Sequence, residues 1–475
     1  MKKRNPYYLT IITLIAALGG FLFGFDMAVI SGAVPFVQQQ FDLSAVQEGW
    51  FVSSALVGCV IGVAFSGELS DRFGRKPALN LSGSLFFLSA VGTAFAPDFT
   101  LLVIARIMGG IAVGVASNVV PLYISEIAPP RIRGRLVTFY QLAITVGILL
   151  AFLSNAWVLN LSESRPDILL VGFLEKIFID ESWRGMFGAE TIPASIFLIC
   201  LAIVPESPRW LVQQNRNEKA RHILKKLIDE NEIDSSIDEI RETLNDVAGS
   251  YRDLLKPGLR TAVLIGILLP LFSQFSGINA IIYYGPRILT EVGIDMNNAL
   301  KSQVLLGIAN MVFTFIAIWK VDSLGRRPLY LIGTAGATIS LIITGIFFYT
   351  GETGSIFLLI SVVLFLSSFA FSIGPLKFVI ASEIFPNRIR GRALALSIMV
   401  MWISDTIVGQ LTPILLSKGG AAATFWFFAL FCAIAFWFIY KKVPETKGKT
   451  LEEIQAMWIS EGNNDEFVKT KRMEK

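Results

Sequence analysis

The sequence is short of charged side chains: of its 475 residues only 16% are Asp, Glu, Lys or Arg, whereas 53% are hydrophobic. A soluble domain usually carries about a quarter charged residues, so this chain lacks the side chains that cover a water-facing surface. Its mean hydropathy is +0.61, and apolar stretches of ~20 residues, long enough to cross a ~30 Å hydrocarbon core, recur along it. The composition indicates a polytopic membrane protein and excludes a soluble enzyme, a nucleic-acid binder and a secreted disulfide scaffold.

Cysteine and histidine are scarce as well. Cys59, Cys200 and Cys432 all fall in apolar stretches, which is typical of small buried side chains and not of a disulfide framework or a metal cluster. The one histidine, His222, stands in the charged run KARH at 219–222, which indicates a solvated helix face. No Walker A motif, nucleophile elbow or metal-ligand spacing is present. We therefore expect no enzyme activity, no metal and no cofactor.

Hydropathy windows of about 19 residues predict an all-α membrane protein with twelve spans. The first six lie near residues 9–33, 50–69, 79–97, 101–124, 137–159 and 188–204, and the second six near 261–284, 302–319, 329–350, 355–381, 393–416 and 423–440. The first apolar run could be a signal peptide, but it continues beyond Asp26 and no convincing small-residue cleavage site follows. It is therefore predicted to be a retained helix.

The short loops predict the orientation of the spans, because cytoplasmic loops carry an excess of Lys and Arg. Basic residues gather in every second loop, at Arg72, Arg75, Lys76, Arg131, Arg133, Arg135, Lys320, Arg326, Arg327, Arg388, Arg390 and Arg392. The intervening loops at 34–49, 98–100 and 351–354 contain neither Lys nor Arg. This alternation predicts that both termini lie in the cytoplasm.

Two longer polar segments interrupt the spans. Residues 205–259 carry both charge signs, with apolar residues every three or four positions, which is typical of short amphipathic helices. Residues 160–187 are expected outside the membrane, because they are too polar to span it. These segments suggest an N-terminal six-helix bundle over 1–204, cytoplasmic linker helices over 205–259, a C-terminal bundle over 260–443 and a cytoplasmic tail over 444–475.

Three loop motifs occur twice, six predicted spans apart. DRFGRKP at 71–77 returns as DSLGRRP at 322–328, SEIAPPRIRGR at 125–135 as SEIFPNRIRGR at 382–392, and PESPR at 205–209 as PETKGK at 444–449. Because an even number of spans separates the copies, the two halves have the same orientation. This predicts parallel repeats related by a pseudo-two-fold axis along the membrane normal, which suits rocking of two bundles around a site at the bilayer midplane.

These motifs, with GGFLFGFD at 19–26, PESPRWL at 205–211, QFSGINAIIYY at 274–284 and PETKGKTLEE at 444–453, closely resemble those of the sugar porter branch of the major facilitator superfamily, in order and in spacing. The resemblance covers essentially the whole chain. It implies alternating access and proton-coupled uptake of a pentose, hexose or related polyol across the bacterial inner membrane. The implied partners are the sugar, the proton and the lipid bilayer, with no nucleic acid and no obligate protein partner.

Two other functions stay open at this point. One is a passive sugar facilitator, which differs in whether accumulation requires Asp26. The other is a transporter-like nutrient receptor, which is less favoured because the cytoplasmic tails are short and hold no recognisable signalling domain.

Ionisable residues inside the predicted spans are costly and are therefore functional candidates. Asp26 lies deep in the first span and Arg106 early in the fourth. A carboxylate whose pairing with Arg changes during a conformational switch can take up a proton on one side and release it on the other. Proton-coupled family members have Asp and Arg at these positions, so the resemblance implies proton coupling, with a fixed ion pair as the alternative.

A second possible intramembrane pair is formed by Lys377 in the tenth span and Asp405 in the eleventh, where the family more often has uncharged residues. Opposite charges on neighbouring helices would reduce the cost of insertion. The two side chains could instead line the cavity and favour an acidic sugar or another polar solute.

A sugar site needs donors and acceptors for hydroxyls and an apolar surface for the ring. By resemblance, the contacts are Gln141, Gln274, Asn279 and Asn310, with Tyr283, Phe23 and Trp402 as aromatic walls or gates and Phe378 at the position of a usual Trp. A single amide could instead connect two helices. Ser273, Ile148 and Met401 depart from the family pattern and leave fewer groups for hydroxyls, so the resemblance implies a sugar but not which one.

Acidic and basic residues also face each other in the repeated loops. Arginine pairs with carboxylates through a planar fork, which gives a directional contact that can form and break. We predict a cytoplasmic latch formed by Arg72, Glu126 and Arg135 in the first half and by Arg326, Glu383 and Arg392 in the second, with Glu206 and Glu445 as further candidates. The alternative is that these charges only set topology and solvate helix ends.

Overall fold

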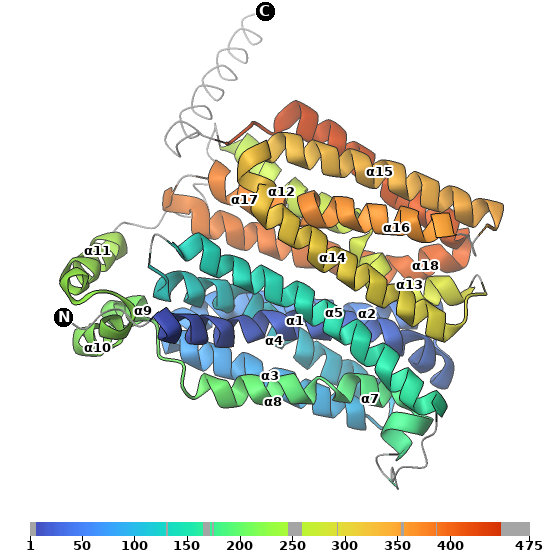
Figure 1. Ribbon diagram of the computed structural model, residues 1–475, viewed down its shortest axis with the longest axis horizontal. Coiled ribbons are helices and arrows are strands. Elements are labelled where there is room, and N and C mark those ends of the chain that lie inside the picture. Colours follow the sequence, from blue (N-terminus) through green and yellow to red (C-terminus); the bar gives the residue numbers. More distant parts are fainter. Residues whose placement is uncertain are drawn as a thin grey trace, which may run out of the picture. The chain divides into compact units, whose positions relative to one another are not determined.

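The chain folds almost entirely into helices (Figure 1). The computed structural model describes residues 6–129, 132–164, 172, 175–245, 259–291, 293–352, 356–385 and 387–447. Within these ranges, 11 helical stretches are long and apolar enough to cross a membrane. The last of them, Ile389–Lys442, has 54 residues and is interrupted at Gly420, whose φ is 72°. It therefore holds both of the last two spans, which accounts for the predicted twelve.

The first five spans are continuous helices. They are α1 (Pro6–Gln40), α2 (Ala45–Phe73), α3 (Arg75–Phe95), α4 (Phe99–Ile127) and α5 (Arg133–Ser164). Helix α1 packs against α5, and α4 packs against both α2 and α3.

The sixth span differs from the prediction. It consists of α7 (Ser182–Gly188) and α8 (Thr191–Leu201), preceded by a π-helical turn, η2 (Lys176–Asp180). Helix α8 lies beside α3 (Figure 1). Helix α5 continues to Ser164 and the sixth apolar stretch begins at Ser182, so both extend into residues 160–187, whose location outside the membrane stays a prediction.

Arg184 explains why hydropathy alone misplaced the start of this span. Its guanidinium lowers the local hydropathy, but the side chain is buried and its polar atoms have partners. Nη1 donates to the carbonyl oxygens of Ala94 (3.2 Å) and Ala96 (2.6 Å), and Nε pairs with Glu181. The guanidinium also lies 4.3 Å from the ring centre of Trp183. A buried charge with such partners can be accommodated at a helix end.

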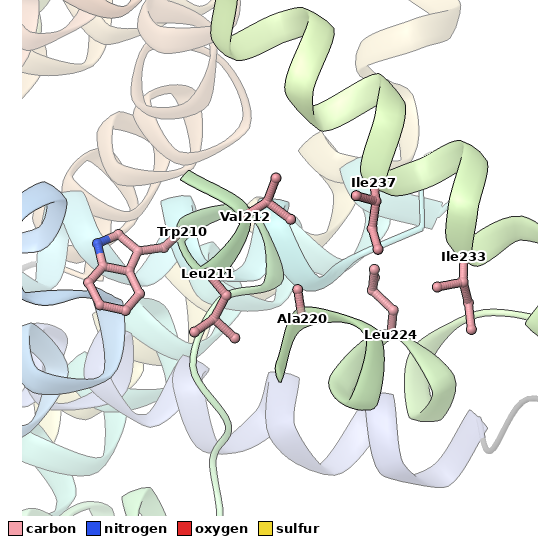
Figure 2. Close-up of a cluster of buried hydrophobic side chains, with 7 residues drawn as sticks. All are labelled: Trp210, Leu211, Val212, Ala220, Leu224, Ile233 and Ile237. Carbon is pink, nitrogen blue, oxygen red and sulfur yellow. The ribbon is translucent and has the colours of Figure 1, made fainter. Parts of the chain in front are cut away.

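Short helices follow the sixth span, as the periodicity predicts. They are α9 (Pro208–Gln213), α10 (Asn217–Leu227), the 3₁₀ turn η3 (Glu230–Glu232) and α11 (Ile233–Asn245). Their apolar faces bury one cluster, shown in Figure 2, of Trp210, Leu211, Val212, Ala220, Leu224, Ile233 and Ile237. Trp210 Nε1 also donates to the carbonyl of Asp71 at the end of α2, which attaches this group to the first bundle.

The second half has interrupted spans. Its elements are α12 (Arg260–Phe275), α13 (Ile278–Glu291), α14 (Met296–Leu324), α15 (Arg326–Thr350), α16 (Ile356–Ser368), the π-helical turn η5 (Phe369–Ile373), α17 (Gly374–Ile384) and α18 (Asn387–Lys442). The chain divides into two compact units. The first comprises residues 1–245, 279–311 and 409–417, and the second residues 246–278, 312–408 and 418–475.

Glycines allow the closest helix contact in the first unit. Gly58 and Gly62 of α2 face Gly110 and Gly114 of α4, and a Cβ on Gly110 would overlap the carbonyl oxygen of Ala55. In membranes, small residues at this four-residue spacing let helix backbones approach closely, because no hydrophobic force holds the helices together.

The outward faces of the spans carry large apolar side chains. Leu88, Trp157 and Ile199 in the first unit and Ile339 and Leu430 in the second are more than half exposed in the isolated chain. In water such surfaces would cause association, whereas in a bilayer they face lipid. The chain is thus a multi-pass membrane protein.

Candidate functional site

A buried ion pair connects α1 and α4 in the middle of the first unit. Arg106 Nη1 lies 2.7 Å from Asp26 Oδ1 and 3.4 Å from the backbone carbonyl oxygen of Asp26. Both residues are only 1% exposed. The guanidinium also lies 5.3 Å from the ring centre of Phe187 in α7. The structure therefore brings together the two residues that the sequence singled out for proton coupling.

Glu190, which the sequence prediction left out, is the third member of this cluster. It lies between α7 and α8, is 1% exposed, and its carboxyl group is within hydrogen-bonding range of Asp26. An ionised carboxylate has no proton to donate, so Asp26 and Glu190 can share a hydrogen bond only when one of them is protonated. Two carboxyl groups next to one guanidinium can thus hold one proton between them.

Gly109 leaves the space that this cluster needs. It follows Arg106 by three residues, on the same face of α4. A Cβ at Gly109 would lie 3.2 Å from Asp26 Oδ1 and 2.5 Å from Ser89 Oγ. A side chain at residue 109 would therefore crowd Ser89 and the Asp26 carboxylate.

In the second unit, Lys377 of α17 is buried within the span. Its Nζ donates to Ser273 Oγ of α12 at 2.9 Å and lies 5.3 and 5.8 Å from the ring centres of Phe378 and Phe369. Asp405 of α18, which belongs to the same unit, is also buried, with an exposed fraction of 2%. Ser273 is the direct hydrogen-bond partner of the ammonium, and the pairing of Lys377 with Asp405 stays a prediction.

The expected sugar contacts fall in both units. Phe23 of α1, Gln141 of α5, Asn279 and Tyr283 of α13 and Asn310 of α14 belong to the first unit, and Gln274 of α12, Phe378 of α17 and Trp402 of α18 to the second. Tyr283 is buried, with its hydroxyl 3.9 Å from Met27 Sδ. Gln274 and Asn279 flank the break between α12 and α13, where Gly277 has a φ of 85°. Their role in sugar binding stays a prediction.

At the C-terminal end of α4, Glu126 forms a bidentate ion pair. Its partner is Arg75, whose Nε and Nη2 each lie 2.9 Å from a carboxylate oxygen. Arg75 Nη1 also lies 3.1 Å from Asp71. The prediction had assigned Arg72 and Arg135 to this latch, but the Arg72 guanidinium lies over the ring of Phe73. Arg75 was overlooked because three basic residues share this loop and the sequence does not say which one points back to α4.

The matching contact of the second half joins Arg326 and Glu383, as the sequence expected. Arg326 Nε and Nη2 lie 3.2 and 3.1 Å from Glu383 Oε1, and the Thr446 hydroxyl donates to the other carboxylate oxygen. Arg392, the third member of the predicted set, lies in α18.

Glu206 and Glu445 cap the helices that begin at these loops. Glu206 accepts hydrogen bonds from the backbone N–H groups of Arg75 (2.9 Å) and Lys76, at the start of α3. Glu445 accepts them from Arg326 (3.0 Å) and Arg327 (3.1 Å), at the start of α15. A carboxylate at a helix N-terminus satisfies free N–H groups and complements the helix dipole.

The two caps differ in their ionisation. Burial raises the pKa of Glu206 above its ordinary value, despite the hydrogen bonds that it accepts from the backbone N–H groups of Ser207, Lys76 and Arg75. Partial burial acts on Glu445 in the same direction, but backbone hydrogen bonds, led by that from Lys447, outweigh it, so the pKa of Glu445 is lowered.

The opposite end of α2 carries another group of contacts within the first unit. Glu48, which is 1% exposed, pairs with Arg287 of α13, and Arg287 Nε also contacts Glu291 at 3.0 Å. Gln410 of α18 accepts from Ser53 Oγ (2.9 Å) and donates to the carbonyl of Val46 (3.0 Å). These contacts join α13 and residues 409–417 to the N-terminal part of α2.

Comparison with known proteins agrees with the sequence motifs. Residues 12–458 match the model of a family described as "Sugar (and other) transporter". The arabinose-proton symporter of Bacillus subtilis (strain 168) is 39% identical over 459 residues, which cover 96% of this chain and 97% of the relative. The D-xylose-proton symporter of Escherichia coli (strain K12) is 39% identical over 489 residues, with coverage of 96% and 97%.

Solved structures of the xylose transporter XylE from E. coli are similar too. An inward open conformation has 38% sequence identity and a TM-score of 0.82, covering 95% of this chain and all of that chain. A structure bound to 6-bromo-6-deoxy-D-glucose has 37% identity and a TM-score of 0.76, covering 96% of this chain and all of that chain.

Proposed function

Because this chain belongs to the sugar transporter family, we propose that it is a proton-coupled symporter that takes up a monosaccharide, either a pentose, a hexose or a related polyol, by alternating access. Relatives named as arabinose-proton and xylose-proton symporters, each 39% identical, support both the sugar substrate and the coupling ion. The sugar and the proton are thus the proposed partners, and the bacterial inner membrane the proposed location.

The observation that carries the proposal is the cluster of Asp26, Arg106 and Glu190. A sugar has no charge, so a proton gradient can drive its uptake only if the protein binds and releases a proton in each cycle. The two carboxyl groups compete for one guanidinium at 1% exposure, where an uncompensated charge is costly. Protonation of one carboxyl removes this competition, which gives a local change that can be linked to a change of conformation.

The coupling then follows from which carboxyl group holds the proton. With Asp26 ionised, its ion pair with Arg106 joins α1 to α4. When Asp26 binds a proton its attraction to Arg106 weakens, and Glu190 can take over as the partner of the guanidinium. Movement of α1 relative to α4 becomes possible in the protonated state, and release of the proton on the cytoplasmic side restores the pair.

The cytoplasmic ion pairs are the proposed latch of the cycle. Arg75 with Glu126, and Arg326 with Glu383, tie helix ends together while the sugar site opens outward. Contact of sugar with the eight polar and aromatic residues placed above is proposed as well. We also propose that both termini lie in the cytoplasm, and that the chain divides into bundles over 1–204 and 260–443 joined by cytoplasmic helices.

The test is uptake into proteoliposomes with and without an inward proton gradient, using radiolabelled sugars. We expect Asp26→Asn to abolish accumulation against a gradient while sugar exchange at equal pH continues, because the amide cannot carry the proton. Asp42→Asn makes the same chemical change at an exposed turn with a φ of 48°, a conformation that Asn tolerates, and serves as the matched control. Undiminished accumulation in Asp26→Asn would overturn coupling at this residue, and equilibration that ignores the gradient in the wild type would identify a passive facilitator.

A further inference from the structure

Two spans of the second half are interrupted, and both interruptions lie where polar residues are buried. The seventh span breaks after Phe275, with Gly277 at a φ of 85° before α13 begins. The tenth span contains η5, a single π-helical turn between α16 and α17. In transporters, discontinuous helices free backbone groups for the substrate, and π-helical turns often occur at functional sites.

Lys377 connects these two interruptions. It follows η5 by four residues, and its ammonium donates to Ser273, two residues before the end of α12. Helices α12 and α17 pack against each other. Ser273 precedes Gln274, one of the expected sugar contacts. A buried side chain with a full charge has thus been placed where the irregular backbone of both spans meets.

The ammonium has more donor capacity than Ser273 uses. It carries three N–H donors, one of which goes to the serine hydroxyl. The ring centres of Phe369 and Phe378 lie 5.8 and 5.3 Å from Nζ. The aromatic faces attract the cation and so stabilise it without using any of its N–H donors.

Asp405 determines the net charge of the site. Its carboxylate, itself 2% exposed, is buried in the same unit as Lys377, so the two opposite charges sum to zero. A neutral pair tolerates a neutral polyhydroxylated ligand, whereas a ligand carboxylate would face Asp405 as a like charge.

We propose that Lys377 is a specificity-determining residue that donates hydrogen bonds to hydroxyl oxygens of a neutral sugar, and that Asp405 excludes acidic sugars by balancing its charge. This rests on the proposed sugar transport but not on proton coupling. Sugar exchange at equal pH is therefore the appropriate assay, because it reports binding and translocation without a gradient.

The experiment compares exchange of neutral aldoses and of glucuronate in wild type, Asp405→Asn and the double variant Lys377→Met with Asp405→Asn. Asp405→Asn leaves Lys377 uncompensated, so we expect glucuronate exchange to rise about tenfold or more above the wild-type rate. The double variant buries no unpaired charge and should fold. We expect its KM for neutral sugars to rise about tenfold, because the donors are lost, and glucuronate exchange to stay at the wild-type rate.

Three results would overturn the inference. If the double variant has the wild-type KM for neutral sugars, Lys377 and Asp405 have only a structural role. If Asp405→Asn exchanges neutral sugars but no glucuronate, Asp405 does not exclude acidic sugars by its charge. If the double variant does not fold, Lys377→Arg keeps the charge but changes the donor geometry. It should alter the rank order of neutral sugars, and an unchanged order would count against the inference. Wild-type protein that exchanges no sugar would instead refute the proposed function.

Discussion

At the scale of single residues, the central feature is that Asp26, which pairs with Arg106, has the buried Glu190 as a neighbour. Substitution of Glu190 by Gln keeps the size of the side chain but removes a negative charge next to Asp26. The amide group of the glutamine can also donate a hydrogen bond to Asp26 at any pH. Both changes favour the ionised form of Asp26. We expect gradient-driven uptake by Glu190→Gln to require a more acidic outside medium, with a rate about tenfold below wild type at neutral pH.

The measurement is the initial rate of uptake as a function of outside pH. Glu175→Gln, at an exposed position of the same segment, is the control and should follow the wild-type profile. A Glu190→Gln profile that superimposes on that of wild type would mean that Glu190 takes no part in holding the proton.

Asp26 and Arg106 could be predicted from the sequence because each is a charge in the middle of an apolar run. Glu190 could not, because the sixth span was expected to begin at 188, which placed this glutamate at the membrane surface. The helix begins at Ser182, since Arg184 is buried through hydrogen bonds to two carbonyl groups. The position of Glu190 thus depends on a tertiary contact that hydropathy does not contain.

At the scale of helices, the contact between α2 and α4 predicts a sharp difference between two glycines. Gly110→Ala places a methyl group against the carbonyl of Ala55 and forces the helices apart, at a cost of about 1–3 kcal/mol. Gly67→Ala in α2 meets nothing within 4 Å and should stabilise the helix by about 0.4–1 kcal/mol. Thermal unfolding of the purified variants in detergent checks both. Equal stability of the two variants would contradict the close packing.

The helix caps predict opposite pH effects for two matched variants. Glu206, with its raised pKa, contributes stability below the ordinary glutamate pKa of about 4.3 and loses it as the pH rises through the folded value. Glu445, with its lowered pKa, contributes stability above about 4.3 and loses it as the pH falls through the folded value. We therefore expect the unfolding midpoint to depend on pH differently in the two variants. Compared with wild type, the slope of the midpoint against pH should change in one direction in Glu206→Gln and in the opposite direction in Glu445→Gln. A parallel shift would be inconsistent with these environments.

Most elements could be predicted at this scale, and the interruptions could not. Runs of apolar residues fix the number of spans, and basic loops favour one orientation. The π-helical turn at Phe369–Ile373 leaves no comparable signal, because it changes the hydrogen-bonding of one turn without changing hydropathy. The pairing of Arg75 with Glu126 was missed for a similar reason, since both Arg72 and Arg75 fit the charge pattern.

At the scale of the whole molecule, the ion pairs at the two ends of the spans should act in opposite directions on access. Glu383→Gln removes the carboxylate that holds Arg326, a charged hydrogen bond of about 1.5–3 kcal/mol. We expect several-fold faster thiol labelling of single cysteines placed at the helix ends next to this pair, in a chain whose three native cysteines are replaced. Arg287→Gln breaks the contact with Glu48 at the other end and should slow the same labelling. If both variants are labelled at the same rate, the two ion pairs are structural contacts that do not control access.

The repeated motifs allow both halves of the molecule to be inferred from the sequence, because three pairs of motifs occur in the same order. The sugar could not be identified in this way. Its contacts depend on residues such as Lys377, which departs from the family pattern and whose neighbours come from separate segments of the chain.

The most direct test of proton-coupled sugar transport is the pH of a weakly buffered medium while a transported sugar enters proteoliposomes that start at the same pH inside and outside. Entry of the sugar should make the medium alkaline, in proportion to the sugar taken up, because each translocation carries a proton inward. Asp26→Asn should exchange sugar with no change of pH. Sugar entry by the wild type without alkalinisation would contradict proton coupling.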